Sequence, residues 1–128
     1  QRHFGTQDDA PRFDCVLLGL GADAHTASLF PGTRALTEHE ATVVANPVPK
    51  LGVERITLTA KVFNAAKRVL FLVSGADKAD ALARVLEGTH QPESYPAQLI
   101  RPDHGDLIWL VDAPAAIRLS ILPTGERP

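Results

Sequence analysis

The segment from Gly19 to Ser28 concentrates the side chains of this sequence that could do chemistry. It holds two glycines, the acid Asp23, then His25 and two hydroxyl residues. A histidine has an ordinary pKa near neutrality, so it can take a proton from an attacking water and return it to a leaving group. Asp23 could orient the imidazole or cap the backbone of a following helix, and one carboxylate can do both. The segment is therefore a candidate for general acid–base catalysis by His25.

Three interpretations of this segment compete. Its glycine spacing after a strand matches a dinucleotide-binding fingerprint, but Pro31-Gly32 ends any helix after about two turns, which is too short for that unit. A second interpretation is a glycine turn and a short helix capped by Asp23, with His25 simply exposed. In the third, the free N–H groups of that helix would favour an anion or a developing oxyanion beside His25. The residues of the segment alone leave the last two open.

The rest of the chain predicts alternating strands and helices. Two apolar runs without alternation, 13–18 and 69–73, are typical of parallel strands buried on both faces. Further elements are expected as strands over 41–45, 55–58 and 107–111, helices over 23–29, 61–66, 77–86 and 114–119, one helical turn near Gln98, and loops over 46–52 and 92–102. This order predicts an α/β fold, a three-layer, mainly parallel sheet with helices on both faces. Ligands of such sheets bind beyond the carboxyl ends of the strands, where Gly19–Ser28 and Ser74–Lys78 lie.

Composition excludes several classes of function. The 128 residues are 45% hydrophobic with a formal net charge of −2, and the scattered basic residues offer no footprint for nucleic acid or an anionic membrane. No apolar stretch has the length of a membrane span. Cys15 is the single cysteine, so it forms no intrachain disulfide, and its apolar neighbours predict a buried, inert thiol. No Cys/His cluster has zinc-site spacing. We expect a cytoplasmic protein with a small ligand, no metal and no cofactor.

Residues Phe13 to Pro31 resemble the signature of the 6-phosphogluconolactonases, a strand followed by LG-x-G-x-DGH-T-x-SLFP. The resemblance continues in the same order at Arg55–Thr59, Val73–Lys78, Pro96–Ile100 and Trp109–Asp112. The signature and these four ordered blocks together are far more specific than any one of them, and they extend over nearly the whole chain after Arg12. The resemblance implies a Rossmann-like fold of the lactonase/deaminase type, here incomplete.

This resemblance also implies an activity, the hydrolysis of 6-phospho-D-glucono-1,5-lactone to 6-phospho-D-gluconate in the oxidative pentose phosphate pathway. His25 would be the catalytic acid–base residue, with Asp23 beside it. The implied substrate-binding residues are Gly19, Gly21, Ser28, Arg55 and Lys78, of which the last two would hold the phosphate unless they are ordinary solvated cations. The chain departs from the signature at Ala24, where the family has glycine; alanine would cost about 1 kcal/mol if φ is positive there.

Two alternatives and one expectation about the chain's extent accompany this interpretation. Glucosamine-6-phosphate deaminases share the LG-x-G-x-DGH core, but they continue with an Asn-Glu pair where this chain has Thr26 to Pro31, so a deaminase-like sugar-phosphate isomerase is the alternative. Members of the family are considerably longer and carry further active-site residues in an N-terminal half. We therefore expect residues 1–128 to be the C-terminal part of one lactonase domain, inactive without the missing N-terminal half as its partner. A non-catalytic partner module is the second alternative.

Overall fold

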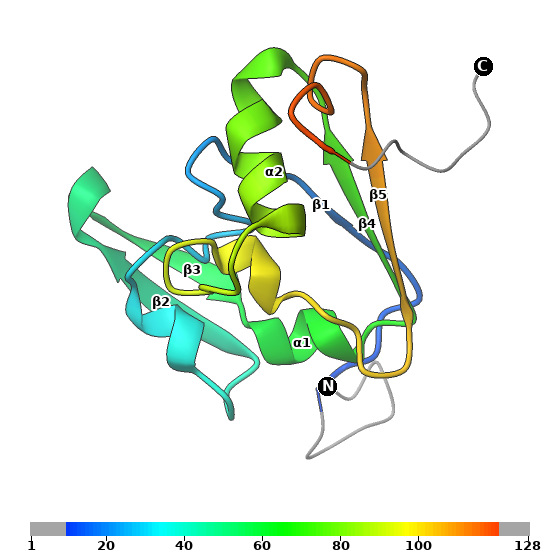
Figure 1. Ribbon diagram of the computed structural model, residues 1–128. Helices are drawn as coiled ribbons and strands as arrows, with labels where there is room; N and C mark the ends of the chain where they lie inside the picture. Colours follow the sequence, from blue (N-terminus) through cyan, green and yellow to red (C-terminus); the bar gives the residue numbers. More distant parts are fainter. Residues whose placement is uncertain (1–9, 121–128) are drawn as a thin grey trace.

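The computed structural model describes residues 10–120, and a parallel sheet of three strands forms its centre (Figure 1). The strands are β1 (Val16–Leu18), β4 (Arg68–Val73) and β5 (Asp106–Val111), in the order β1-β4-β5. Both neighbouring pairs are parallel. The α/β class and the mainly parallel sheet expected from the sequence are confirmed.

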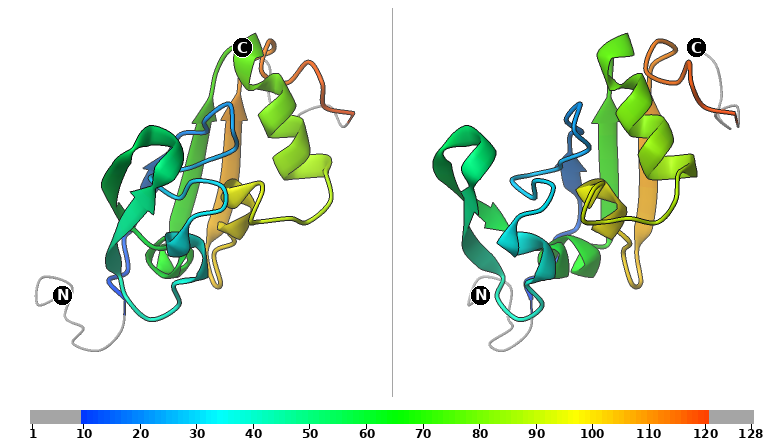
Figure 2. Two further views of the ribbon diagram at one scale, coloured as in Figure 1. Left: turned by 90° about the vertical axis from the view of Figure 1, so that its left-hand side faces the viewer. Right: turned by 60° about the vertical axis from the view of Figure 1, so that its left-hand side comes forward.

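Helix α2 (Ala79–Glu87) covers one face of this sheet (Figure 2). Its predecessor is a single 3₁₀ turn, η4 (Ala76–Lys78), and together they match the helix predicted over 77–86. Leu82 is fully buried, as are Val69 and Phe71 on β4, because alternate residues of a strand point to the same face. The other described helical elements are helix α1 (Ala60–Ala65) and three 3₁₀ turns: η2 (Arg34–Thr37), η3 (Pro49–Leu51) and η5 (Pro96–Leu99). The last of these turns lies where one helical turn was expected, near Gln98.

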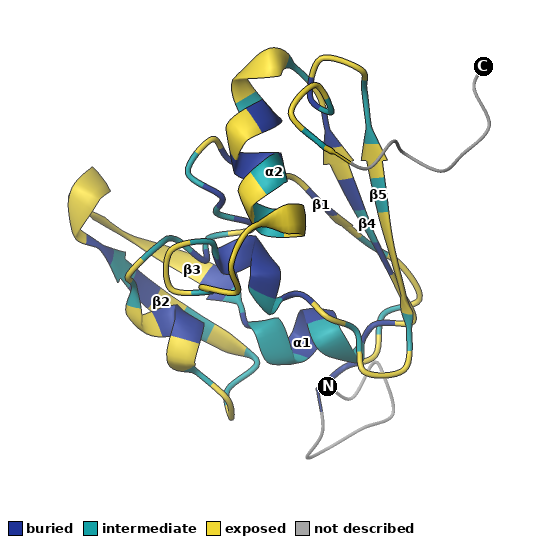
Figure 3. Ribbon diagram, in the orientation of Figure 1, coloured by how far each residue is buried: buried dark blue, intermediate teal, exposed yellow. Residues whose placement is uncertain are grey.

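The opposite face of the sheet is exposed. Leu17 is 63% exposed, Leu72 51% and Leu110 50%, and the register of the three strands places them on one surface with Leu70 and Ile108. Exposed stretches of β4 and β5 are visible in Figure 3. The prediction that the first and fourth strands are buried on both faces is therefore wrong for the described chain, whose helices cover one face only.

Strands β2 (Val43–Val48) and β3 (Val53–Leu58) form a separate antiparallel hairpin. The predicted first strand of this pair is present, but it continues through residues expected to form a loop. Pro47 is tolerated because the hairpin has only two strands, so a proline can sit where no second neighbour needs its N–H. Asn46 lies opposite Arg55 in the register, and its side chain is fully buried.

Two predicted helices are absent, and the expected burial of Cys15 is wrong. Residues 23–29 form turns and an isolated bridge between Thr26 and Leu29, and both Ala24 and Ala27 have positive φ, 69° and 51°, which a right-handed helix excludes. Residues 114–119 are turns. Cys15 is exposed, because the strand begins only at the next residue.

Candidate active site

The loop that follows β1 closes on itself through backbone hydrogen bonds. The N–H of Gly21 donates to the carbonyl oxygen of His25 (2.9 Å), and the N–H of Ala24 donates to the carbonyl oxygen of Gly21 (2.9 Å). The Thr26 hydroxyl spans the base of the loop by donating to the Gly19 carbonyl oxygen (2.8 Å). These bonds place His25 at the carboxyl edge of the sheet, the edge at which ligands of parallel sheets bind.

Asp23 and His25 form a hydrogen-bonded pair. The Asp23 Oδ1 atom lies 2.5 Å from Nδ1 of the imidazole and also accepts the backbone N–H of His25 at 3.0 Å. Partial burial raises the pKa of Asp23, but the hydrogen bonds from the ring and the backbone of His25 outweigh it, so that this pKa lies below its ordinary value. Asp23 is thus an acceptor at neutral pH, and Nδ1 must carry the proton. In the neutral form of such an imidazole, the other nitrogen, Nε2, carries the lone pair that a general base requires.

The expected oxyanion support from a helix N-terminus is wrong, because no helix begins at this loop. The Asp23 carboxylate instead accepts a hydrogen bond from the backbone N–H of His25. This bond stabilises a turn where the first turn of a helix was expected. Of the two roles considered for Asp23, the helix cap is therefore absent, whereas the contact with the imidazole is present, and Oδ1 makes both this contact and the bond to the backbone N–H.

Gly21 provides the space that the imidazole occupies. A Cβ atom at Gly21 would lie 2.1 Å from Nδ1 and 2.2 Å from Cε1 of His25, and 2.8 Å from Oδ1 of Asp23. The Phe30 ring stacks on the imidazole with 4.3 Å between centroids and 21° between planes. The ring of His25 therefore has a fixed position between Gly21 and Phe30, and its need for space explains the glycine at position 21 of the signature. Gly19, by contrast, has no atom within 4 Å of a built Cβ.

We expect Gly21→Ala to displace the His25 imidazole and break its hydrogen bond to Asp23. The added methyl group cannot share the volume of Nδ1, and the backbone around it is held by the loop's own hydrogen bonds. Proton NMR checks this through the downfield Nδ1–H resonance expected for the short bond, which should disappear. Gly19→Ala is the matched control and should keep that resonance. An unchanged resonance in Gly21→Ala would contradict the conclusion that Gly21 provides the space for the imidazole.

Ala24, the one departure from the signature, has φ of 69°. The left-handed conformation costs an alanine about 1–2 kcal/mol relative to glycine. The Ala24 side chain is, however, almost fully buried at 2% exposure, and burying a methyl group returns about 0.8 kcal/mol. The strain foreseen for this position is therefore real, and packing of the methyl group offsets part of it.

The hairpin β2–β3 forms hydrogen bonds with both the N–H and the carbonyl oxygen of Ser28. The Ser28 N–H donates to Thr57 Oγ1 (3.2 Å), and the Ser28 carbonyl oxygen accepts from Asn46 Nδ2 (2.9 Å). Arg55 lies opposite Asn46 in the register and two residues from Thr57, so all three project from the same face of the hairpin. This face is turned toward the loop, which Asn46 and Thr57 contact.

Lys78 follows the carboxyl end of β4, the strand next to β1, so its turn and the His25 loop leave the same edge of the sheet. The turn is fastened by Asp112, which accepts the Ser74 hydroxyl at 2.6 Å and the Gly75 N–H at 3.1 Å, and which also accepts the N–H of Ala115 at 2.9 Å. Within residues 10–120, no hydrogen bond or ion pair is recorded between the loop and the side chains of Arg55 or Lys78.

The Asp112 linkage predicts an acid-sensitive contribution to stability. Hydrogen bonds from Ser74, then from the backbone of Ala115 and Gly75, hold the pKa of Asp112 below its ordinary value. A lowered folded-state pKa stabilises the fold above the unfolded pKa of about 3.9, and this stabilisation is lost as the pH falls through the folded value. In urea denaturation, the midpoint difference between wild type and Asp112→Asn should be larger at pH 6 than at pH 3. A difference that does not change with pH would contradict this prediction.

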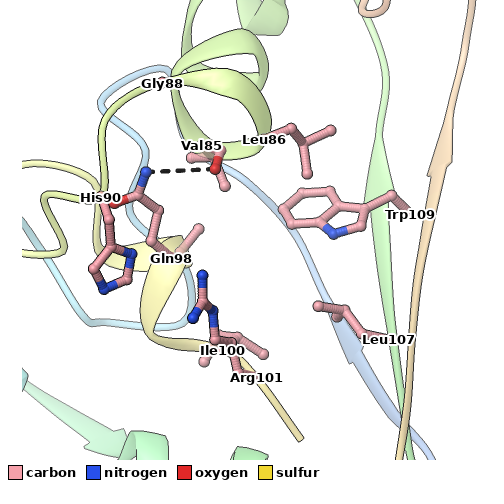
Figure 4. Close-up of a pocket in the computed structure, with 10 residues that line it drawn as sticks. Val85, Leu86, Gly88, His90, Gln98, Ile100, Arg101, Leu107 and Trp109 are labelled. Atoms are coloured by element: carbon pink, nitrogen blue, oxygen red, sulfur yellow. Dashed lines mark hydrogen bonds between the residues drawn. The ribbon is translucent and has the colours of Figure 1, made fainter. Parts of the chain in front are cut away.

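A cleft of about 230 Å³ lies between the C-terminal end of α2, η5 and β5 (Figure 4). Its apolar wall includes Trp109, whose ring stacks on Phe71 with 3.9 Å between the ring centroids. The buried amide of Gln98 is satisfied by the chain itself, through Gln91, Arg84 and Thr89. None of the predicted site residues lines this cleft. Nor does the described part of the chain bring three His, Cys, Asp or Glu side chains together in a metal-binding arrangement.

The chain is similar to known proteins over most of its length. Residues 1–109 match the profile of the family described as glucosamine-6-phosphate isomerases/6-phosphogluconolactonase. The chain belongs to this family. It is 46% identical over 111 residues to a 6-phosphogluconolactonase of Nostoc sp., covering 87% of this chain and 45% of that protein. It also resembles the crystal structure of 6-phosphogluconolactonase from Leishmania guyanensis, with a TM-score of 0.76 and 34% identity over 91% of this chain and 46% of that one.

The Leishmania lactonase is more similar to this chain than a deaminase of the same family is. A structure of a monomeric glucosamine-6-phosphate deaminase gives a TM-score of 0.64 at 28% identity, over 81% of this chain and 47% of that one. The lactonase resemblance recognised in the sequence is thus confirmed. The chain spans less than half the length of each of these relatives. In the described residues, no helix is long and apolar enough to cross a membrane.

Proposed function

We propose that this chain supplies the acid–base part of an active site that hydrolyses 6-phospho-D-glucono-1,5-lactone to 6-phospho-D-gluconate, a step of the oxidative pentose phosphate pathway in the cytoplasm. The observation that carries the proposal is the hydrogen bond between Asp23 and Nδ1 of His25, which favours the tautomer whose Nε2 can accept a proton. The similarity to lactonases over most of this chain supports the choice of substrate.

The reaction follows from this pair. Nε2 of His25 takes a proton from a water molecule as its oxygen attacks the lactone carbonyl carbon, and the carbonyl oxygen becomes an oxyanion. When the tetrahedral intermediate collapses, the carbonyl re-forms and the bond to the ring oxygen breaks. That oxygen takes the proton from Nε2, so the histidine returns to its starting state. Asp23 stabilises the imidazolium that exists between the two transfers. No step requires a cofactor.

Arg55 and Lys78 are proposed to bind the phosphate of the substrate. Arg55 is exposed on the hairpin face that grips the loop, and Lys78 is half-buried at the turn after β4. Neither makes an ion pair recorded in the described residues, so both cations are available to an anion. If each contact is equally strong in the bound substrate and in the transition state, charge reversal raises KM more than it lowers kcat.

We further propose that residues 1–128 act as the C-terminal part of one domain, completed by a polypeptide equivalent to the N-terminal half of its relatives. The uncovered sheet face, defined by Leu17, Leu70, Leu72, Ile108 and Leu110, is an apolar surface of the kind that another layer covers in a three-layer fold. This partner would bring the remaining active-site groups, and the chain alone would not turn over substrate.

Co-expression of the chain with the N-terminal half of the Nostoc lactonase tests the function. The reconstituted protein should hydrolyse 6-phosphogluconolactone and release no ammonia from glucosamine 6-phosphate. Ammonia release without lactone hydrolysis would establish the deaminase alternative instead. Robust lactonase activity of the chain alone would overturn the requirement for a second half, and a reconstituted protein inactive on both substrates would support a non-catalytic module.

A further inference from the structure

The side chain of Asn46 is the centre of a hydrogen-bond network beside the His25 loop. It is 0% exposed. Its Oδ1 accepts the N–H of Ala35 at 3.0 Å, and its Nδ2 donates to the Ser28 carbonyl oxygen and to Thr33 Oγ1, both at 2.9 Å. A buried amide whose donors and acceptor are all used has one orientation, because rotation would leave several groups unpaired. Asn46 therefore fixes three points of the segment 28–35.

Two contacts connect this amide to the imidazole. The Thr33 hydroxyl, which accepts from Asn46, donates to the carbonyl oxygen of Phe30 at 2.7 Å. The Phe30 ring stacks on His25. The imidazole is thus held at Nδ1 by Asp23, which belongs to its own loop, and against its face by Phe30, whose backbone is held from the hairpin.

The hairpin also holds the loop at Ser28, through Asn46 on β2 and Thr57 on β3. Only 4% of Thr57 is exposed. The helix predicted over 23–29 is absent, so side chains of the hairpin hold this segment in place. A polar anchor of this kind specifies the loop's position because each broken bond would leave a buried group unsatisfied.

We propose that Asn46 is a positioning residue, which sets the orientation of the His25 imidazole through Thr33 and Phe30. The effect of Asn46 on catalysis rests on the proposed role of His25 as the base, whereas its effect on the position of the loop does not. One face of the hairpin would then both carry Arg55 and hold the loop of the catalytic ring.

Thr33→Val in the 128-residue chain tests this inference. Valine has the shape of threonine and adopts the extended backbone of residue 33 (φ −103°, ψ 161°), but it lacks the hydroxyl that joins Asn46 to Phe30. The readout is the imidazole proton and nitrogen NMR spectrum, with the His25 signals identified by their absence in His25→Gln. We expect Thr33→Val to shift the His25 ring signals and weaken the downfield Nδ1–H resonance, and Thr33→Ser to restore both.

Thr59→Val is the matched control. Thr59 is also extended (φ −93°, ψ 166°), and its buried hydroxyl makes one bond, to the Ala41 carbonyl oxygen at 2.8 Å, outside the network. It should leave the His25 signals in place. Unchanged His25 signals in Thr33→Val, or equal shifts in both variants, would overturn the inference. Should Thr33→Val not fold, Thr33→Ala gives the same reading. The proposed lactonase function would survive that failure, because it is tested separately by turnover.

Discussion

Replacing His25 with alanine is expected to lower kcat of the reconstituted lactonase by about 100- to 10,000-fold, the contribution of a positioned general acid–base group. Without the imidazole, water would have to attack the lactone without a base, and the ring oxygen would leave without a donor. The substrate's phosphate contacts would remain, so KM should change much less than kcat. Steady-state hydrolysis of 6-phosphogluconolactone measures both constants.

A pair of aspartate variants separates this role from general effects on the fold. Asp23→Asn keeps the size of the side chain but removes the carboxylate that requires the proton on Nδ1, so it should lower kcat as well. Asp14→Asn is the same chemical change at an exposed residue. The ion pair of Asp14 with Lys67 (2.8 Å) lies just before strands β1 and β4 begin, at the edge of the sheet opposite His25. This substitution should leave kcat unchanged. Full turnover by His25→Ala would remove the histidine from the mechanism.

The elements with long, regular apolar patterns were predictable from the sequence. β4 and α2 lie within one or two residues of their expected bounds, because β4 is a continuous apolar run and the apolar residues of α2 repeat with the period of a helix. The loop after β1 was not. The sequence offers Asp23 as a helix cap, but Oδ1 bonds the N–H two residues on, and Ala24 turns left-handed at φ 69°. Such local competition between side chain and backbone has no signature in apolar periodicity.

The candidate site was predictable in part for a similar reason. His25 and Asp23 are recognisable because their types and spacing carry chemistry, and the structure joins them at 2.5 Å. Asn46 was missed because it precedes a proline, which indicates the end of a strand, whereas its role depends on contacts 11 to 18 residues away in the sequence. Asp112 has a weak signal, an acid directly after a strand at the ligand-binding edge, although its partners in the turn after β4 emerge only from the register.

Leu72→Asp is expected to prevent reconstitution while leaving the chain folded. Leu72 is 51% exposed on the uncovered sheet face, so a carboxylate there stays hydrated in the isolated chain. Docking of an N-terminal half would bury that charge in an apolar interface at a penalty of several kcal/mol. Since about 1.4 kcal/mol corresponds to a factor of ten, the Kd for the second half should rise by about a hundredfold or more. Titration of the chain with the Nostoc half, followed by lactonase activity, gives this Kd.

Ile56→Asp is the control for that experiment, because Ile56 is more exposed still, at 78%, and lies on the hairpin rather than on the parallel sheet. The same charge at this position should leave the Kd nearly unchanged if docking uses the sheet face. Thermal denaturation of both variants alone should show similar Tm values, since neither substitution places a charge in the core. Equal losses of affinity would mean that added charge matters more than its location, and an unchanged Kd for Leu72→Asp would place the second half elsewhere on the molecule.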